Sequence, residues 1–394
     1  MKNLSLAILA GGKGSRIKKF SNNYPKPMVK FNNIHFLQYL INIYTKYPID
    51  KIYILTGYKS DIIFKKFHNK TFNFTKIICL KEKKFMGTGG ALFKLKSKVK
   101  DFILVNGDTI FDIDLINFFK SISKQKIGSL ALTSMDKNTN NYKLNNLSIN
   151  SGTLIYKRKS MLMNGGVYFF RKKIFRYLKN EPLSLEDDLL PKFIQNKKLT
   201  AKKYKKFFLD IGTPKYIRSA HKKLKRYFYK PAVFLDRDGV INYDNGYVYK
   251  KKDFKFRKGV LKGLKYLIKK NYYIFLITNQ AGIAKGYYKE TDFKKLHIYL
   301  KNYLSKNNIY FNDVQYCPFH PKGKIKRYKR KSSLRKPGNQ MIKNIFKNWI
   351  VDKQNSFMIG DKISDELCAK RSKINFFYAK NDFFKQVKKI CNNF

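Results

Sequence analysis

Short apolar runs alternate with longer amphipathic stretches along the first hundred residues. The apolar runs predict strands at residues 4–10, 51–58, 75–82 and 102–108, and the stretches between them predict helices at residues 35–47, 61–68 and 91–99. Such an alternation is typical of βαβ units, in which helices cover a parallel sheet. Because right-handed crossovers bring the carboxyl ends of the strands to one edge, we expect a ligand site there.

A second set of apolar runs begins near residue 230. Runs at residues 232–235, 272–280 and 356–360 predict further buried strands. Between the two sets, residues 221–231 are basic, fit a helix and end at Pro231, as expected at the close of a domain and a short linker. A chain of 394 residues is comfortable for two cores. The predicted fold class is α/β, with one domain at residues 1–225 and another at residues 231–394.

The formal net charge of +60 raises the question of nucleic-acid binding. The lysines are spread along the whole chain, which favours a composition bias over a nucleic-acid-binding stripe. Residues 322–331 form the densest basic run and are predicted to be an exposed loop. The apolar runs are too short for a bilayer span, and four scattered cysteines indicate no disulfide framework. We therefore expect a cytoplasmic protein without membrane or specific nucleic-acid partners.

Glycines follow the first predicted strand directly. At Gly11, Gly12 and Gly14, small residues let backbone amides approach a phosphate, and the start of a following helix adds positive potential. Arg16 and Lys26 can then meet phosphate charge. Further along, Asp108 and Asp210 each end an apolar run, where carboxylates beside phosphate oxygens suit Mg²⁺.

Seven segments extend this pattern: LAGGKGSR at residues 9–16, PKPM at 25–28, GTGGA at 87–91, NGDTIFDID at 106–114, NGGVY at 164–168, SLEDDLLP at 184–191 and FLDIGTP at 208–214. In this order they resemble the sugar-1-phosphate nucleotidyltransferase family over about residues 4–220, and most closely the branch that guanylylates D-glycero-D-manno-heptose 1-phosphate.

The resemblance implies a Rossmann-like fold of the GT-A type and assigns residues to three tasks. The nucleotide would be bound by Ala10, Gly11, Gly12, Gly14, Arg16, Lys26, Thr88, Gly89 and Gly90, with Arg16 and Lys26 catalytic. The sugar would be held by Asn164, Gly165 and Glu186, and Mg²⁺ by Asp108 and Asp210. Two family features are absent: residues 154–161 lack the usual glutamate, and the tyrosine-glycine step near Tyr142 reads Tyr-Lys.

The second half carries a pair of aspartates, Asp236 and Asp238, after an apolar run, and Gly239 allows a tight turn beside them. One carboxylate can attack phosphorus while the other protonates the leaving oxygen. Thr278 and Asn279 end the next run and can donate to phosphoryl oxygens. Arg335 and Lys336 supply cations, and Asp361, with Asp365 beyond it, can complete a Mg²⁺ site.

These motifs resemble the haloacid-dehalogenase superfamily from Pro231 to Asn393, and in detail the D-glycero-D-manno-heptose 1,7-bisphosphate 7-phosphatases. The resemblance implies a HAD-like Rossmannoid fold, Asp236 as nucleophile and Asp238 as general acid and base. Thr278 and Lys336 would bind phosphate, and Asn279 and Arg335 would contact substrate. Mg²⁺ would lie among Asp236, Asp361 and the Asp238 carbonyl.

Many of these relatives hold a structural zinc before the Arg-Lys-Pro segment. Here Cys317 is followed by a histidine one position late, at His320, and Ser332 and Leu334 stand where the second cysteine pair falls. A structural zinc needs four nitrogen or sulfur ligands, so we expect no zinc site.

The two resemblances together predict a bifunctional enzyme of nucleotide-activated heptose synthesis that uses Mg²⁺ in both domains. Its substrates would be sugar phosphates and an NTP, with GTP favoured by the resemblance, and its product would feed surface glycan assembly. Two alternatives stay open: a hexose-1-phosphate nucleotidyltransferase fused to a histidinol-phosphatase-like or other sugar phosphatase, and a basic nucleic-acid-binding protein on a degenerate transferase fold. The sequence leaves the anomer and the oligomeric state undecided.

Overall fold

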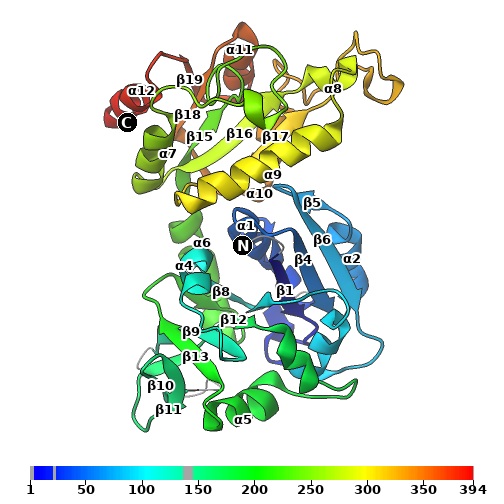
Figure 1. Cartoon of the computed structure of the whole chain (residues 1–394), viewed down its shortest axis with the longest axis vertical. Coiled ribbons are helices and arrows are strands. Elements are labelled where there is room, and N and C mark those ends of the chain that lie inside the picture. Colours follow the sequence, from blue (N-terminus) through cyan, green and yellow to red (C-terminus); the bar gives the residue numbers. More distant parts are fainter. Residues whose placement is uncertain (1–3, 21–23, 136–144, 394) are drawn as a thin grey trace. The chain divides into compact units, whose positions relative to one another are not determined.

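The computed structural model describes residues 4–20, 24–135 and 145–393, except for the side chains of Arg16 and Lys18. The chain divides into two compact units (Figure 1). One comprises Met1–Ile43 and Ile49–Lys223, and the other comprises Tyr44–Pro48 and Leu224–Phe394. We call them the N-terminal and C-terminal units and describe each by itself.

A ten-stranded mixed sheet forms the centre of the N-terminal unit, in the order β10-β11-β13-β9-β12-β7-β1-β4-β6-β5. The strands are β1 Ser5–Ala10, β4 Lys51–Thr56, β5 Thr71–Phe72, β6 Thr75–Lys81, β7 Phe102–Asn106, β9 Gly128–Ser134, β10 Leu147–Asn150, β11 Thr153–Tyr156, β12 Leu162–Phe170 and β13 Leu199–Lys203. Strands β7, β1, β4 and β6 run parallel as predicted, whereas β12 lies antiparallel to both β7 and β9. Two short pairs complete the unit: β2 Lys30–Phe31 with β3 Ile34–His35, and β8 Thr109–Phe111 with β14 Phe208–Asp210.

The helices of the first 228 residues are α1 Phe36–Thr45, α2 Ser60–Phe67, α3 Gly87–Gly90, α4 Leu115–Lys120, α5 Leu190–Gln195 and α6 Pro214–Phe228. The last residues of α1 and α6, from Tyr44 and from Leu224, are counted with the C-terminal unit. The predictions for residues 35–47 and 61–68 are confirmed by α1 and α2. The prediction for residues 91–99 is wrong, because this stretch contains only a 3-10 turn at Ala91–Leu95, which continues directly from α3. The glycine loop after β1 is likewise followed by a kinked 3-10 segment, Ser15–Phe20, and not by a regular helix.

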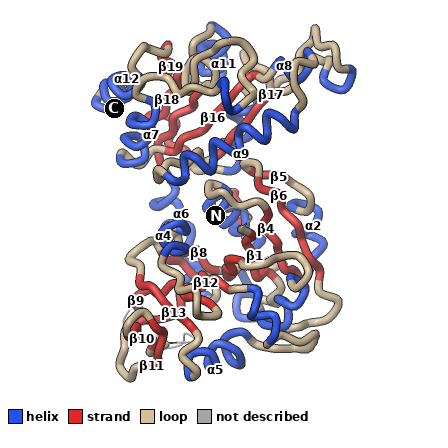
Figure 2. The backbone as a smooth tube through the Cα atoms, in the orientation of Figure 1, coloured by secondary structure: helices blue, strands red, loops and turns tan. Residues whose placement is uncertain are grey.

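A five-stranded parallel sheet forms the C-terminal unit, in the order β17-β16-β15-β18-β19 (Figure 2). The strands are β15 Lys230–Leu235, β16 Tyr273–Asn279, β17 Asp313–Cys317, β18 Val351–Gly360 and β19 Asn375–Tyr378. The helices are α7 Val260–Lys269, α8 Ala281–Lys285, α9 Glu290–Lys306, α10 Gln340–Asn348, α11 Ile363–Ser372 and α12 Phe383–Asn392.

The core of this unit explains why its strands read as continuous apolar runs. One cluster joins Phe234, Phe275 and Met358 of the sheet to side chains of α10 and α11. A parallel sheet covered on both faces buries every side chain of its central strands, which is why no polar alternation is seen. Each fully buried Phe or Leu contributes about 1.5–3 kcal/mol.

The predicted linker is shorter than the sequence indicated. Helix α6 confirms the helical prediction for residues 221–231 in its last turns, but Pro231 lies inside β15 and not ahead of it. A register shift between Pro231 and Val233 accommodates the proline opposite β18. Within the described residues, no helix has the length and apolar character that crossing a bilayer requires.

Candidate active sites

Four parallel strands of the N-terminal unit bring their carboxyl ends to one cavity. Its volume is about 240 Å³. Gly11 and Gly12 follow β1, Glu82 follows β6, and Asp108 follows β7, and all four line this cavity. The backbone at this edge is crowded: a Cβ on Gly57, which follows β4, would come within 2.7 Å of the Gly11 carbonyl oxygen and 2.9 Å of Glu82 Oε2.

Lys26 and Asp108 form the charged end of the cavity. Lys26 Nζ lies 2.5 Å from Asp108 Oδ2. Burial alone would raise the pKa of Asp108, but the Lys26 ammonium and the hydrogen bonds to the carboxylate lower it below its usual value. Asp210 is brought to the same place, because β14 pairs with β8 and Ile211 N donates to the Asp108 carbonyl at 2.9 Å. The two predicted magnesium ligands are therefore neighbours.

The other residues expected at the nucleotide do not all face the cavity. Ala10 and Thr88 line it, whereas the amides of Gly89 and Gly90 donate to the Leu183 carbonyl at 2.8 and 3.1 Å. These two glycines therefore join the GTGG segment to residues 181–185. Gly14 adopts a φ of +64° against the Lys26 side chain.

Two residues considered for the nucleotide site lie wholly or partly outside the described part of the chain. Arg16 lies in the Ser15–Phe20 segment, and its side chain is outside the described part. Tyr142 also lies outside the described residues.

The residues predicted to hold the sugar are linked by hydrogen bonds beside this cavity. Glu186 lines the cavity, and Thr88 Oγ1 donates to its Oε2 at 2.6 Å. Tyr168 OH donates to the other oxygen at 3.5 Å and accepts from Asn164 Nδ2 at 2.6 Å. Gly165 packs so closely on the Phe111 ring that a Cβ there would collide with it. Asn164 and Glu186 are thus held in one polar network.

A second cavity, of about 370 Å³, lies at the carboxyl ends of β15, β16 and β18 in the C-terminal unit. The structure brings five of the residues predicted for this site together in its lining: Asp236, Asp238, Asn279, Arg335 and Lys336. Thr278 is buried just behind, where its Oγ1 accepts from Gln280 Nε2 at 2.9 Å. Asn279 Nδ2 donates to the Lys336 carbonyl at 3.1 Å, and Asn279 Oδ1 accepts from Lys336 N at 3.0 Å.

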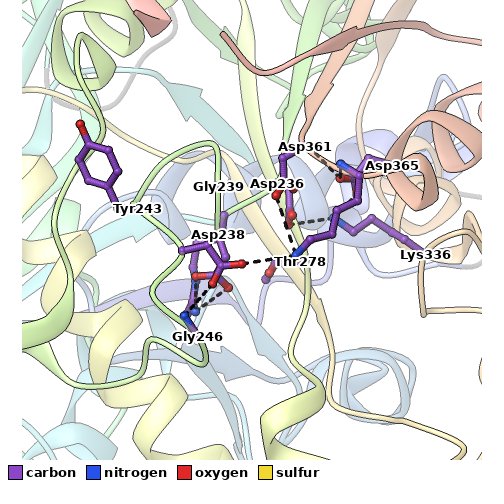
Figure 3. Close-up of polar contacts among 12 residues, drawn as sticks. Asp236, Asp238, Gly239, Tyr243, Gly246, Thr278, Lys336, Asp361 and Asp365 are labelled. Atoms are coloured by element: carbon purple, nitrogen blue, oxygen red, sulfur yellow. Dashed lines mark hydrogen bonds and ion pairs between the residues drawn. The ribbon is translucent and has the colours of Figure 1, made fainter. Parts of the chain in front are cut away.

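Asp236 sits in a buried cluster of charges (Figure 3). Lys336 Nζ lies 2.8 Å from Asp236 Oδ1 and 2.7 Å from Asp365 Oδ1, and it donates to the Ile277 carbonyl at 3.0 Å. Burial raises the pKa of Asp236 to about 6, with Asp365 and Asp238 adding to the rise and Lys336 opposing it. The Lys336 ammonium is thus held between two carboxylates and a backbone carbonyl.

The carboxylates of this cluster fit a divalent cation. Asp236, Asp361 and Asp365 each place an oxygen within 4.8 Å of the others. Asp361 Oδ1 is buried and has no hydrogen-bond partner among the described residues, and burial raises the pKa of its carboxyl. A buried carboxylate oxygen without a donor is costly unless a cation neutralises it, and Mg²⁺ prefers such ligands.

Asp238 is fixed from three sides. Its oxygens accept from Arg237 Nη2 at 2.8 Å, from Asn242 Nδ2 at 3.0 Å and from Gln280 Nε2 at 3.1 Å. Arg237 is completely buried and also donates to the Val248 carbonyl at 2.6 Å. Gly239, with φ +82°, permits the turn, since a Cβ there would collide with the Asp361 carboxylate.

Cys317 and His320, at the expected zinc position, each contact a nearby backbone group. Cys317 Sγ lies 3.7 Å from the Phe319 carbonyl oxygen, and His320 Nδ1 accepts from Lys322 N at 3.1 Å. In the described part of the chain, the Asp236 group is the one set of three or more such side chains close enough to share an ion.

Some residues at the two sites carried no recognisable signal in the sequence. Glu82 is the last residue of an apolar run whose edge was expected to bind a ligand, so its position offered a hint. Arg237 and Gln280 each stand next to a predicted motif, but their contacts with it depend on side-chain directions that periodicity does not reveal. His320 was considered only for a zinc site, whereas the structure places it in the lining of the phosphatase cavity.

Comparison with known proteins shows two matches placed end to end. The nucleotidyl transferase family model matches residues 6–227, and the polynucleotide kinase 3 phosphatase model matches residues 233–389. The D-glycero-beta-D-manno-heptose-1,7-bisphosphate 7-phosphatase of Rhodopseudomonas palustris is 39% identical over 162 residues, which cover 40% of this chain and 90% of that protein.

Two further similarities involve one relative and one solved structure. The D-glycero-alpha-D-manno-heptose-1,7-bisphosphate 7-phosphatase of Campylobacter jejuni is 39% identical over 165 residues, which cover 40% of this chain and 91% of that protein. The crystal structure of HddC from Yersinia pseudotuberculosis is similar with 28% identity and a TM-score of 0.48, over 56% of this chain and 100% of that one. The chain belongs to the nucleotidyl transferase family over residues 6–227 and, in its C-terminal unit, to the family of the heptose-1,7-bisphosphate 7-phosphatases.

Proposed function

We propose that the chain catalyses two consecutive steps of nucleotide-activated heptose synthesis. Residues 231–394 would remove the 7-phosphate from D-glycero-D-manno-heptose 1,7-bisphosphate. Residues 1–225 would then transfer GMP from GTP to the heptose 1-phosphate and release pyrophosphate. The observation that carries the proposal is the Asp236 cluster in a unit 39% identical to a heptose-bisphosphate 7-phosphatase, joined to a nucleotidyl transferase unit. The relatives include both anomers, so either anomer is a candidate substrate.

In the phosphatase step, a carboxylate oxygen of Asp236 attacks phosphorus and the bond from phosphorus to the sugar oxygen breaks. Asp238 donates a proton to that oxygen, then takes one from the water that attacks the aspartyl phosphate. Lys336 and Thr278 hold the phosphoryl oxygens. The Mg²⁺ ligands would be Asp236, Asp361 and the Asp238 carbonyl, with Asp365 beside them, and the ion would neutralise phosphate charge.

In the transfer step, an oxygen of the sugar phosphate attacks the α-phosphorus of the nucleotide, and pyrophosphate leaves in line. Catalysis here consists of positioning and charge neutralisation, so no protein nucleophile is needed. The Gly11 and Gly12 backbone and Lys26 would hold phosphate oxygens, and Arg16 would add a second cation. Asp108 and Asp210 would supply the carboxylates for Mg²⁺ beside the triphosphate.

The preference for guanine rests on Glu82. Glu82 lines the nucleotide cavity and is 8% exposed, and burial raises the pKa of its carboxyl to about 7. The hydrogen-bonding edge of guanine presents two adjacent donors, N1–H and N2–H₂, and a carboxylate is the side chain that accepts both. Adenine presents a donor beside an acceptor there, which a carboxylate cannot satisfy.

The test is a reconstitution with purified protein, heptose 1,7-bisphosphate, GTP and Mg²⁺. We expect inorganic phosphate, pyrophosphate and GDP-heptose, and without GTP only phosphate and heptose 1-phosphate. Parallel reactions with hexose 1-phosphates, histidinol phosphate and the other NTPs measure specificity. The proposal fails if neither phosphate nor a nucleotide sugar forms from the heptose substrate.

A further inference from the structure

A long loop borders the phosphatase cavity in the C-terminal unit. It comprises residues 318–334, between β17 and the Arg335–Lys336 pair, and we call it the basic loop because it contains many lysines and arginines and no carboxylate. Figure 1 draws it in orange beside α8. His320 near its start and Arg335 just after its end line the cavity together with Lys285. A segment of like charges repels itself, so something outside the loop must hold it in place.

The anchor is Glu290, the first residue of α9. Tyr328, in the middle of the basic loop, donates its hydroxyl to Glu290 Oε2 at 2.6 Å, and Tyr316, on β17 just before the loop, donates to Oε1 at 2.5 Å. Arg327 adds an ion pair with Oε2 at 3.4 Å. One carboxylate thus receives donors from the loop and from the strand that precedes it.

This anchor reaches the cavity through the backbone. The carbonyl of Tyr328 accepts from His320 N at 3.1 Å, so the residue that Glu290 holds also holds the cavity-lining histidine. The outer part of the loop is fastened to α8, where Ile325 N donates to the Ala284 carbonyl at 3.0 Å. Arg330 lies 3.8 Å from the centre of the Phe319 ring and closes the loop on itself.

Glu290 is well suited to be a fixed anchor. Burial alone would raise the pKa of its carboxyl, but hydrogen bonds from Tyr316, Tyr328 and Lys294 lower it to about 2. The carboxylate is therefore ionised near neutral pH. Hydrogen bonds to an ionised group are about twice as strong as those between neutral groups. Tyr328 is 8% exposed, so water competes little for its hydroxyl.

We propose that Glu290, Tyr316 and Tyr328 form a metal-independent clamp that positions the basic loop, and with it His320, for the part of the substrate beyond the transferred phosphate. The three are positioning residues, since none of them lines the cavity. The choice of substrate rests on the proposed function, whereas the clamp itself does not.

Limited trypsin digestion tests the clamp without any substrate. The basic loop is rich in exposed cleavage sites, so release of the loop should speed cleavage within it, as located by mass spectrometry. We expect faster cleavage in Tyr328→Phe and Glu290→Gln than in the wild type. Lys294→Gln is the matched control, because Lys294 pairs with Glu290 at 2.9 Å from the same helix and does not connect Glu290 to the loop. A zinc chelator should leave wild-type cleavage unchanged.

Kinetics test the consequence for the site. With heptose 1,7-bisphosphate, we expect Tyr328→Phe and Glu290→Gln to raise KM about three- to tenfold, with kcat little changed. This is less than the full effect of a lost hydrogen bond to a charge, because the clamp acts on the substrate only through the loop. With p-nitrophenyl phosphate, which lacks the sugar and its second phosphate, both constants should match the wild type. Circular dichroism and the melting temperature establish that each variant is folded.

The outcomes separate the clamp from the proposed function. Wild-type cleavage rates in both variants, or faster wild-type cleavage on chelation, would overturn the clamp. Faster cleavage with an unchanged KM, or an equal loss of kcat on both substrates, would overturn its role in positioning. If the wild type ignores heptose 1,7-bisphosphate but cleaves p-nitrophenyl phosphate, the proposed substrate is wrong, while the digestion result still decides the clamp.

Discussion

Replacing Glu82 by glutamine should weaken the preference of the N-terminal unit for GTP. Glutamine keeps the size of the side chain, so the fit against Gly11 and Gly57 is preserved. It can accept from only one of the two guanine donors and turns its own NH₂ group toward the other. A lost hydrogen bond to a charged group costs about 1.5–3 kcal/mol, which corresponds to about a 10- to 150-fold fall in kcat/KM for GTP. The value for ATP should stay the same or rise.

The pH dependence follows from the raised pKa of Glu82. Below its pKa of about 7 the carboxyl is protonated and no longer accepts from both donors, so KM for GTP should rise as the pH falls through 7 in the wild type and stay flat in Glu82→Gln. The folded state binds this proton more tightly than the unfolded state does, so stability falls as the pH rises from 4.5 to about 7. The shift corresponds to about 3 kcal/mol at most, and Glu82→Gln should be more stable than the wild type above pH 7.

The assay is pyrophosphate release with GTP, ATP, CTP and UTP at saturating sugar phosphate, from pH 6 to pH 8.5. Glu181→Gln is the control, because Glu181 is an exposed glutamate of the same unit. Urea unfolding at pH 6 and pH 8.5 measures the stability change in the same variants. An unchanged ratio of GTP to ATP activity in Glu82→Gln would refute the assignment of Glu82 to the base. A gain in stability without a change in that ratio would show that Glu82 is buried for another reason.

Three further predictions concern other residues of the two sites. Asp236→Asn should abolish phosphate release and leave GDP-heptose formation from heptose 1-phosphate intact. Asp108→Asn should abolish GDP-heptose formation and leave phosphate release intact. Loss of both activities in either variant would contradict two independent sites. Phe85 is 62% exposed and lines the nucleotide cavity. If its ring stacks on the base, Phe85→Ala should cost about 1–3 kcal/mol of binding free energy. KM should then rise for every NTP alike, as measured by pyrophosphate release. Lys336→Met leaves Asp236 and Asp365 buried without their cation and should lower the free energy of unfolding by about 3–5 kcal/mol in urea titrations with EDTA, and Mg²⁺ should restore part of the loss.

Much of the fold could be predicted because its strands are strongly apolar. The parallel strands β1, β4, β6 and β7, and β15, β16 and β18, were each indicated by a run of buried residues. The helix predicted at residues 91–99 failed for a local reason. The GTGG segment begins its own short helix, and the glycines pack on the carbonyls of residues 181 and 183. Those partners lie about ninety positions away in the sequence, so no local pattern could reveal this contact.

The antiparallel half of the N-terminal sheet was also beyond the sequence pattern. Strands β9 and β12 are paired with a register shift between Asn164 and Val167, where Gly166 adopts a positive φ. This bulge lies within the NGGVY segment and interrupts the pairing of the two strands there. A run of apolar residues predicts that a strand exists, but neither its partner nor its direction.

The sequence by itself determined where the chemistry stands along the chain. Asp236, Asp361, Gly11 and Asp108 follow apolar strands, and Thr278 lies near the end of one. Parallel strands deliver such residues to one edge whatever the details of packing. Only the tertiary structure decided which side chains complete these sites. Glu82 facing the nucleotide cavity, Lys336 between two aspartates and Glu290 bound to two tyrosines of distant segments depend on side-chain directions and on burial. Each of these contacts involves residue types that are common throughout the chain. Burial removes the water that would otherwise hydrogen-bond to these side chains, so their role depends on the protein groups that they contact.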